Sequence, residues 1–169
     1  MAEEAEGGSQ AFGGEQRVRL GPRQGAAALI LYFDTSALVK LVLAERGSDL
    51  AWELWAGAQP SVSSILAYPE GRAALAAARR GGRLDSDLYR RSLLNFEKTY
   101  EELLSIEVDD RLAMSAGERA ASFGLRGADA VHLATALDLS DEEVIFVTWD
   151  RDLADAAASA GLAVVGAPV

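Results

Sequence analysis

The sequence predicts an α/β fold in which helices flank a mainly parallel sheet. Three observations support this prediction. Short apolar segments alternate along the chain with longer segments of helical periodicity, which is the pattern of βα units. The first of these strands ends a continuous apolar run from Ala26 to Phe33, as expected of a strand buried on both faces. The 169 residues, half of them hydrophobic, suffice for one domain with its own core.

Residues 1–27 precede this alternating pattern. They are rich in Gly, Gln and Glu, have no apolar periodicity, and carry charges that nearly cancel. A segment with no apolar face has little to offset the entropy lost on ordering. We therefore predict a disordered tail over residues 1–27, with an over-long start to the reading frame as the alternative, and a single domain over residues 28–169.

Five segments of the domain have the length and composition of strands. They are residues 29–33, 61–63, 105–108, 144–148 and 162–165. The intervals between them are predicted as helices, which cover residues 36–45, 49–56, 64–80, a segment capped by Asp85 that runs to about 104, 110–123, 128–139 and 150–160. No internal repeat is visible.

The boundaries of these helices follow from capping residues and glycines. Ser36 is a candidate cap for the first helix, and Gly47 offers a stop before the second. Gly81 closes the alanine-rich third helix, and Asp85 opens the fourth. Residues 124–127 form a turn that leads into the sixth helix.

The composition excludes several classes of protein. The absence of cysteine excludes disulfides, zinc–thiolate sites and thiol nucleophiles, and it fits a reducing cytoplasm. No apolar run approaches the roughly 20 residues that a membrane span requires, and the amino terminus lacks a signal-peptide pattern, so we expect a soluble protein. The net charge of −10 counts against a broad basic surface for nucleic acids.

Four acidic residues occupy positions that a parallel sheet would bring together. Asp34 ends the first strand, Glu70 follows the second, Asp129 is in the first turn of its helix, and Asp150 ends the fourth strand. Active sites of such sheets lie outside the carboxyl ends of the strands. We therefore expect these four carboxylates to converge, although they span more than a hundred residues of sequence.

Converging carboxylates point to a divalent cation. Their mutual repulsion raises their pKa values unless a cation neutralises them. Magnesium or manganese, held by carboxylates, waters and substrate phosphate, is the natural partner of such oxygen donors. An ion of this kind can deprotonate a water and stabilise the charge on a breaking phosphodiester.

Taken singly, each acid also has a structural interpretation. Asp129 is favoured by the dipole at the start of its helix, Asp150 is a candidate cap of the last helix, and Glu70 could be an exposed helix residue. Asp34 fits a capping role least, because Ser36 is available to cap the helix that follows.

Four segments in order, LILYFDTSALVKLVLAE, SSILAYPEGRAAL, LRGADAVHLATA and VIFVTWDRDLADAA, resemble the acidic motifs of PIN-domain ribonucleases. They are most similar to the toxins of VapBC-type toxin–antitoxin pairs, over residues 29–167. The resemblance implies a three-layer fold with about five strands, commonly a homodimer. It also implies a magnesium or manganese site formed by Asp34, Glu70, Asp129 and Asp150, an RNA substrate, and a cognate antitoxin that covers the acidic pocket.

Other residues of these motifs leave alternatives open. Pro69 precedes Glu70, and it either kinks that helix or stands in its first turn. Asp152 competes with Asp150 as the fourth acid; we prefer Asp150, with Thr148 as a neighbouring hydroxyl. We interpret His132 as a packed helix residue, since a histidine is an unusual ligand for magnesium.

Further side chains are candidates for contacts with partners. Arg72, Arg79, Arg80 and Arg83 form either a phosphate-contacting rim or a solvated helix end. Leu38, Trp52, Trp55 and Leu75 are candidate walls of an apolar groove for the antitoxin.

Two alternative functions remain. A haloacid-dehalogenase-like phosphohydrolase would use Asp34 as a nucleophile, but it needs a second aspartate two residues later, where this chain has Ser36. A non-catalytic interaction module of the same fold is the other alternative. The presence of all four acids argues against it.

Overall fold

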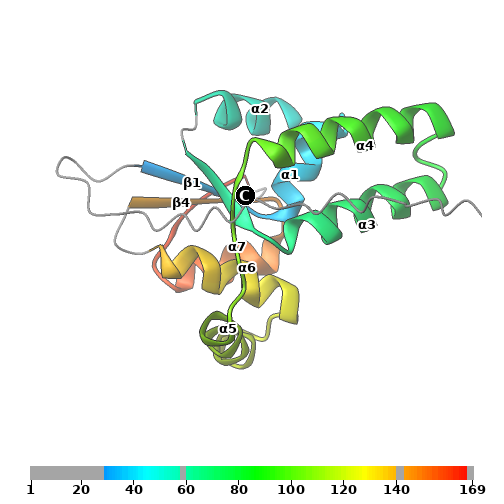
Figure 1. Ribbon diagram of the computed structural model, residues 1–169. Coiled ribbons are helices and arrows are strands. Elements are labelled where there is room, and N and C mark those ends of the chain that lie inside the picture. The colour runs from blue at the N-terminus through cyan, green and yellow to red at the C-terminus, as the bar shows by residue number, and fades with distance from the viewer. Residues whose placement is uncertain (1–28, 58–59, 140–142, 167–169) are drawn as a thin grey trace, which may run out of the picture.

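The computed structural model describes residues 29–57, 60–139 and 143–166 (Figure 1). The predicted tail, residues 1–27, lies outside the described residues. The elements in order are β1 (Leu29–Phe33), α1 (Thr35–Val42), α2 (Ser48–Gly57), β2 (Ser61–Ser64), α3 (Ala67–Arg80), α4 (Ser86–Glu101), β3 (Leu104–Ile106), α5 (Asp110–Phe123), α6 (Gly127–Asp138), β4 (Glu143–Thr148), α7 (Arg151–Ser159) and β5 (Ala163–Gly166).

The five strands form one sheet in the order β3-β2-β1-β4-β5, and every pair of neighbours is parallel. The predicted α/β fold with a parallel sheet is confirmed. The side chains of β1 alternate between the two faces, as the pleat requires. Leu31 and Phe33 join the core under α1 to α4, whereas Ile30 and Tyr32 join the core under α6 and α7.

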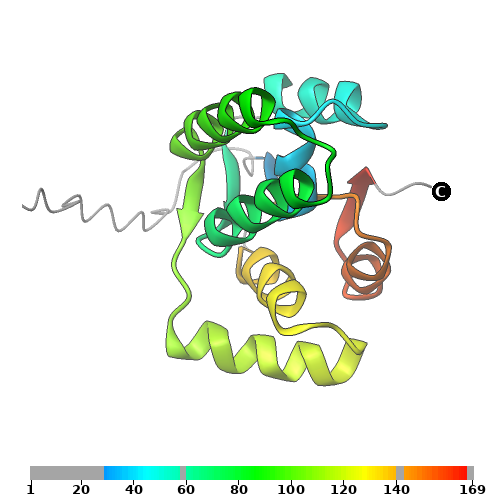
Figure 2. The same cartoon turned by 90° about the vertical axis from the view of Figure 1, so that its right-hand side faces the viewer.

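The helices complete a three-layer arrangement (Figures 1 and 2). Helices α1 to α4 lie on one face of the sheet, and α6 and α7 lie on the other. Helix α5 packs against α6 through Leu112 and Ala116 and stands farther from the sheet. Within the described ranges, no helix combines the length and the apolarity that a membrane crossing requires.

The strand order creates a crevice between β1 and β4. Strand β1 has β2 as its neighbour along one edge and β4 as its neighbour along the other edge. The chain runs from β1 to β2 first and returns later to form β4. Ligands of such sheets bind where the order reverses, at the carboxyl ends of the strands. The register pairs Phe33 with Val147, so the next residues, Asp34 and Thr148, emerge side by side at this crevice.

Several predicted boundaries were wrong by a few residues. The third helix begins at Ala67 rather than at Ser64, because Ser64 is the last residue of β2. Pro69 therefore stands in the first turn of α3, where its missing N–H removes no helical hydrogen bond. The fourth helix ends at Glu101, which lets β3 begin at Leu104.

Candidate active site

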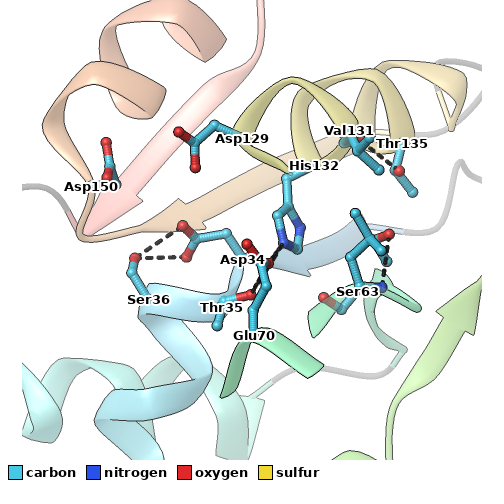
Figure 3. Close-up of polar contacts among 12 residues, drawn as sticks. Asp34, Thr35, Ser36, Ser63, Glu70, Asp129, Val131, His132, Thr135 and Asp150 are labelled. Atoms are coloured by element: carbon cyan, nitrogen blue, oxygen red, sulfur yellow. Dashed lines mark hydrogen bonds and ion pairs between the residues drawn. The ribbon is translucent and has the colours of Figure 1, made fainter. Parts of the chain in front are cut away.

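A cavity of about 400 Å³ opens at the carboxyl ends of β1 and β4. All four predicted acids line it, and Figure 3 shows Asp34, Asp129 and Asp150 around the same space, with Glu70 beside His132. Thr35, Ser36, Lys40, Arg126, His132 and Trp149 are among the other residues of its walls. The fold therefore brings together the four carboxylates that the sequence singled out.

Asp34 is the most buried of the four acids, with 3% of its surface exposed. Its Oδ1 accepts hydrogen bonds from the backbone N–H of Ala37 at 2.9 Å and from the Ser36 hydroxyl at 2.8 Å. The Thr148 hydroxyl donates to Oδ2 at 2.8 Å. Burial raises the pKa of Asp34, although these hydrogen bonds favour the ionised form and limit the rise.

The cap of α1 differs from the prediction. Ser36 was expected to cap this helix, but the N-cap is Asp34, and Ser36 bonds to the Asp34 carboxylate instead. The cause is the short junction: β1 ends at Phe33 and α1 begins at Thr35, so Asp34 alone occupies the capping position. The same carboxylate therefore starts the helix and faces the cavity.

Glu70 lies in the first turn of α3 and is held through one oxygen. The Thr35 hydroxyl donates to its Oε2 at 2.6 Å, and His132 Nε2 lies 2.8 Å from the same atom. Burial alone would raise the pKa of Glu70, but the hydrogen bonds from His132 and Thr35, with the nearby charge of Arg126, outweigh it and lower the pKa. Glu70 is therefore a carboxylate at neutral pH.

His132 connects this carboxylate to the core. Its ring is buried, and Nδ1 lies 2.9 Å from the hydroxyl of Tyr32. Because the Glu70 carboxylate can only accept, Nε2 donates to it, and the Tyr32 hydroxyl holds the other ring nitrogen. The histidine is packed, as interpreted from the sequence, but it also orients an acid of the cavity, which we had not predicted.

A single guanidinium joins the two remaining acids. Arg126 Nε donates to Asp129 Oδ2 at 2.8 Å, and its Nη2 lies 3.3 Å from Asp150 Oδ2. Asp129 raises the pKa of Arg126 further through this hydrogen bond and its charge. Asp150 also caps α7, since its Oδ1 accepts from the backbone N–H of Leu153.

The competing acid of the fourth motif faces elsewhere. Asp152 lines a separate depression, together with Phe123 and Asp155. Asp150 lines the cavity that holds the other three acids. The position of the cap explains the difference, because a residue two positions into α7 is turned away from the strand end by about 200° of helix rotation.

The donor set suits a hard divalent cation. All four acids offer carboxylate oxygens, the ligands that magnesium and manganese prefer. Among the described residues, no group of three or more His, Asp or Glu side chains is already close enough together to hold a metal ion. Asp129 and Asp150 instead bind Arg126. Magnesium needs only one or two carboxylates and keeps several waters, so the residues fit such an ion once Arg126 releases them.

The arginines predicted as a possible phosphate rim do not line this cavity. Arg72 pairs with Glu97, and Arg83 pairs with Glu45. In the described part of the chain, the cationic side chains at the cavity are Lys40, which pairs with Glu45, and Arg126. Sequence reasoning missed Arg126; its place three residues before Asp129, at the start of a helix, was the available signal.

A glycine and a tryptophan shape one wall of the cavity. Trp149 packs so closely on Gly47 that a Cβ at position 47 would overlap the indole. Gly47 has a φ of +95°, a conformation that other residues rarely adopt. The turn between α1 and α2 is thereby held against the wall of the site.

Comparisons with known proteins place the chain in a family and show the same fold in solved structures. The family model of the PIN domain matches residues 31–159. "Ribonuclease VapC45" of Mycobacterium tuberculosis is 44% identical over 142 residues, which cover 82% of this chain and 96% of the relative. A solved structure from Pyrobaculum aerophilum has a TM-score of 0.63 at 22% identity, covering 83% of this chain and 86% of its own. The structure of VapBC-5 of M. tuberculosis, a member of the VapBC family of toxin–antitoxin systems, has a TM-score of 0.53 at 20% identity. The match covers 83% of this chain and 98% of that chain.

Proposed function

The chain belongs to the PIN-domain family and, within it, to the VapC ribonucleases, and from this we propose that it hydrolyses RNA phosphodiester bonds as the toxin of a toxin–antitoxin pair. The observation that carries the proposal is the meeting of four carboxylates in one cavity at the switch point of the sheet. A dehalogenase-like phosphohydrolase is not supported, because position 36 holds a serine bonded to Asp34.

We infer that the reaction uses a divalent cation, Mg²⁺ with Mn²⁺ as the alternative. Asp34 and Asp129 are the proposed main ligands, and Glu70 and Asp150 complete the negative site directly or through water. Such an ion, when bound, activates a water and stabilises the charge that develops on the phosphate.

The surrounding side chains prepare these carboxylates for their roles. Ser36 and Thr148 fix the rotamer of Asp34, so little reorganisation is needed when a ligand arrives. Thr35 and His132 both bond to Oε2 of Glu70, and no donor among the described residues bonds to its Oε1. We assign that free oxygen to accept a hydrogen bond from the attacking water.

The expected protein partner is a cognate antitoxin, a proposal supported by the likeness to a VapBC system. The prediction that four residues line an apolar groove was wrong for two of them, since Leu38 and Leu75 are completely buried and belong to the core. Trp52 remains available, with 49% of its surface exposed, whereas Trp55 packs on Phe33. The homodimer implied by the family stays a prediction that light scattering of the purified chain tests.

Two measurements test the proposed function. Purified protein should cleave RNA in the presence of Mg²⁺ or Mn²⁺ and stop cleaving when EDTA removes the ion. Expression of the chain alone should arrest growth, and the protein encoded beside it should restore growth. Failure to cleave RNA with either ion would support the non-catalytic interaction module. Cleavage without growth arrest would leave the nuclease standing and contradict the toxin role.

A pair of substitutions tests which acid of the fourth motif takes part. Asp150→Asn keeps a side chain that can cap α7 but removes one charge from the cavity, so we expect RNA cleavage to fall by about tenfold or more. Asp152→Asn is the matched control, with the same change two residues away, and should stay within about twofold of wild type. A larger loss in the control would move the proposed site from Asp150 to Asp152.

We also propose that residues 1–27 are dispensable for catalysis and that the nuclease domain covers residues 28–169. Deletion of residues 2–25 should leave the melting temperature and the RNA cleavage rate nearly unchanged. The competing hypothesis is that Arg17, Arg19 and Arg23 bind the RNA backbone. In that case truncation would slow cleavage at low salt, and the difference from the full chain would shrink as salt is added.

A further inference from the structure

We propose that Arg126 is an exchanging cation of the active site: it neutralises Asp129 and Asp150 while no divalent ion is bound, and it moves onto a phosphate of the RNA once the ion has taken these carboxylates. This inference rests on the proposed nuclease function, and it assigns to Arg126 a contact with the substrate.

The first position of the exchange is visible in the structure. Arg126 uses two different nitrogens to reach Asp129 Oδ2 and Asp150 Oδ2, and it thereby bridges α6 and α7 across the mouth of the cavity. Its backbone is the N-cap of α6, but its side chain makes no capping hydrogen bond. Within the described residues, the two acids are its hydrogen-bonding partners, so the position of the guanidinium depends on them.

A divalent ion and the guanidinium compete for the same two carboxylates. Arg126 already binds Asp129 and Asp150, and a second cation brought to these carboxylates would lie close to the guanidinium and be repelled by it. The other cationic side chain of the cavity, Lys40, is already paired with Glu45. Ion binding therefore favours release of Arg126, and the free energy of its two salt bridges opposes ion binding.

The second position follows from the anchoring and exposure of the side chain. The side chain of Arg126 is 79% exposed, so solvent and not protein surrounds most of it. Rotation of this side chain carries the guanidinium outward without moving α6. An RNA phosphate that reaches the cation in the cavity arrives beside the released guanidinium, whose planar fork can donate two hydrogen bonds to phosphate oxygens.

The first part of the proposal, that the ion displaces Arg126, is tested by calorimetric titration of the full-length protein with Mn²⁺ alone. Exposed ion pairs contribute about 0.2–1 kcal/mol each, so Arg126→Gln, which loses two of them, should bind Mn²⁺ roughly two- to thirtyfold more tightly than wild type. Arg151→Gln is the matched control: it removes the same charge beside Asp150, but no ion pair joins Arg151 to another described residue. Its Mn²⁺ affinity should stay close to that of wild type. Equal or weaker Mn²⁺ binding by Arg126→Gln overturns the proposal.

The second part, that Arg126 contacts an RNA phosphate, is tested by measuring kcat/KM at increasing salt concentration. The assay uses saturating Mn²⁺ and a single-stranded RNA that the wild type cleaves. Loss of one phosphate contact should lower kcat/KM of Arg126→Gln and reduce the slope of log(kcat/KM) against log salt by about 0.7. Arg126→Lys keeps the charge and should keep the slope. An unchanged slope in Arg126→Gln overturns the phosphate contact. A wild type that neither binds Mn²⁺ nor cleaves RNA would instead refute the proposed function itself.

Discussion

Asp34→Asn should abolish RNA cleavage while the chain still folds. Asp34 is a proposed main ligand of the cation, and its carboxylate lies where β1 and β4 present their carboxyl ends. Substitution of residues that merely support a metal ligand already costs about 10- to 100-fold. We therefore expect this substitution of a ligand to lower kcat/KM by at least about 100-fold and to weaken Mn²⁺ binding in a titration.

The fold should tolerate this substitution because asparagine preserves the contacts of the aspartate. Its oxygen can accept the N–H of Ala37 and so still caps α1. Its amide group can donate to the hydroxyls of Ser36 and Thr148, which are able to accept as well as donate. Asp34→Ala would remove the cap as well as the ligand, and its loss of activity would not distinguish the two roles.

The stability of Asp34→Asn should depend on pH in a defined direction. Burial raises the pKa of Asp34 in the folded chain. The protonated carboxyl therefore contributes stability that is fully present below its ordinary pKa of 3.8 and is lost as pH rises through the raised value. Without metal at pH 7, the uncharged variant should melt at a higher temperature than wild type, and this difference should vanish in acid.

Addition of Mn²⁺ should reverse that order. An ion that binds the folded state raises the melting temperature in proportion to its affinity, and wild type has the ligand that the variant lacks. A variant that retains full cleavage activity would contradict the proposed mechanism. A variant that is less stable than wild type at neutral pH without metal would show that its hydrogen bonds, rather than the buried charge, dominate at this position.

His132→Leu should have the second large effect, on stability and activity together. The substitution removes the hydrogen bond between His132 and the buried hydroxyl of Tyr32, which keeps Thr135 as a second partner. Loss of one such hydrogen bond costs about 0.5–1.5 kcal/mol, which chemical denaturation can measure. Glu70 loses one of its two donors at Oε2, so we expect kcat/KM to fall by about tenfold.

A double variant separates these two effects. Tyr32→Phe combined with His132→Leu replaces both polar partners by apolar groups, so it should recover stability to within about 1 kcal/mol of wild type. It should not recover activity, because Glu70 still lacks its histidine donor. Recovery of both would mean that His132 acts only by stabilising the fold. Recovery of neither would contradict the hydrogen bond as the source of the destabilisation.

The fold was predictable because its signals are local. Helix α5 was predicted with both of its ends, Asp110 and Phe123, and Gly124, the first residue of the predicted turn, follows it with a φ of +66°. The end of strand β1 at Phe33 was also predicted, because the unbroken apolar run from Ala26 stops there. Boundaries were wrong where the connection between two elements is very short, as after Ser64, because a residue there satisfies the pattern of both elements.

The candidate site was predictable in its acids but not in their partners. Each acid follows a strand or starts a helix, positions that a general rule of parallel sheets brings together. The hydrogen bond between Tyr32 and His132 joins residues 100 positions apart, so no local sequence pattern predicts it. Arg126 was overlooked for a different reason: in a chain with 14 arginines, only the geometry distinguishes the one that bridges two carboxylates.

The place of β4 inside the sheet, next to β1, bears on when the protein becomes active during its synthesis. Strand β4 lies between β1 and β5, yet Asp150 follows Asp34 by 116 residues. At about 5–20 residues per second, a ribosome takes roughly 6 to 23 s to add that stretch. Throughout this interval β1 has an open edge, and the crevice lacks the wall that β4 and α7 provide. Because the proposed site needs Asp150, we expect a nascent chain that still lacks β4 and α7 to be unable to cleave the RNA around it.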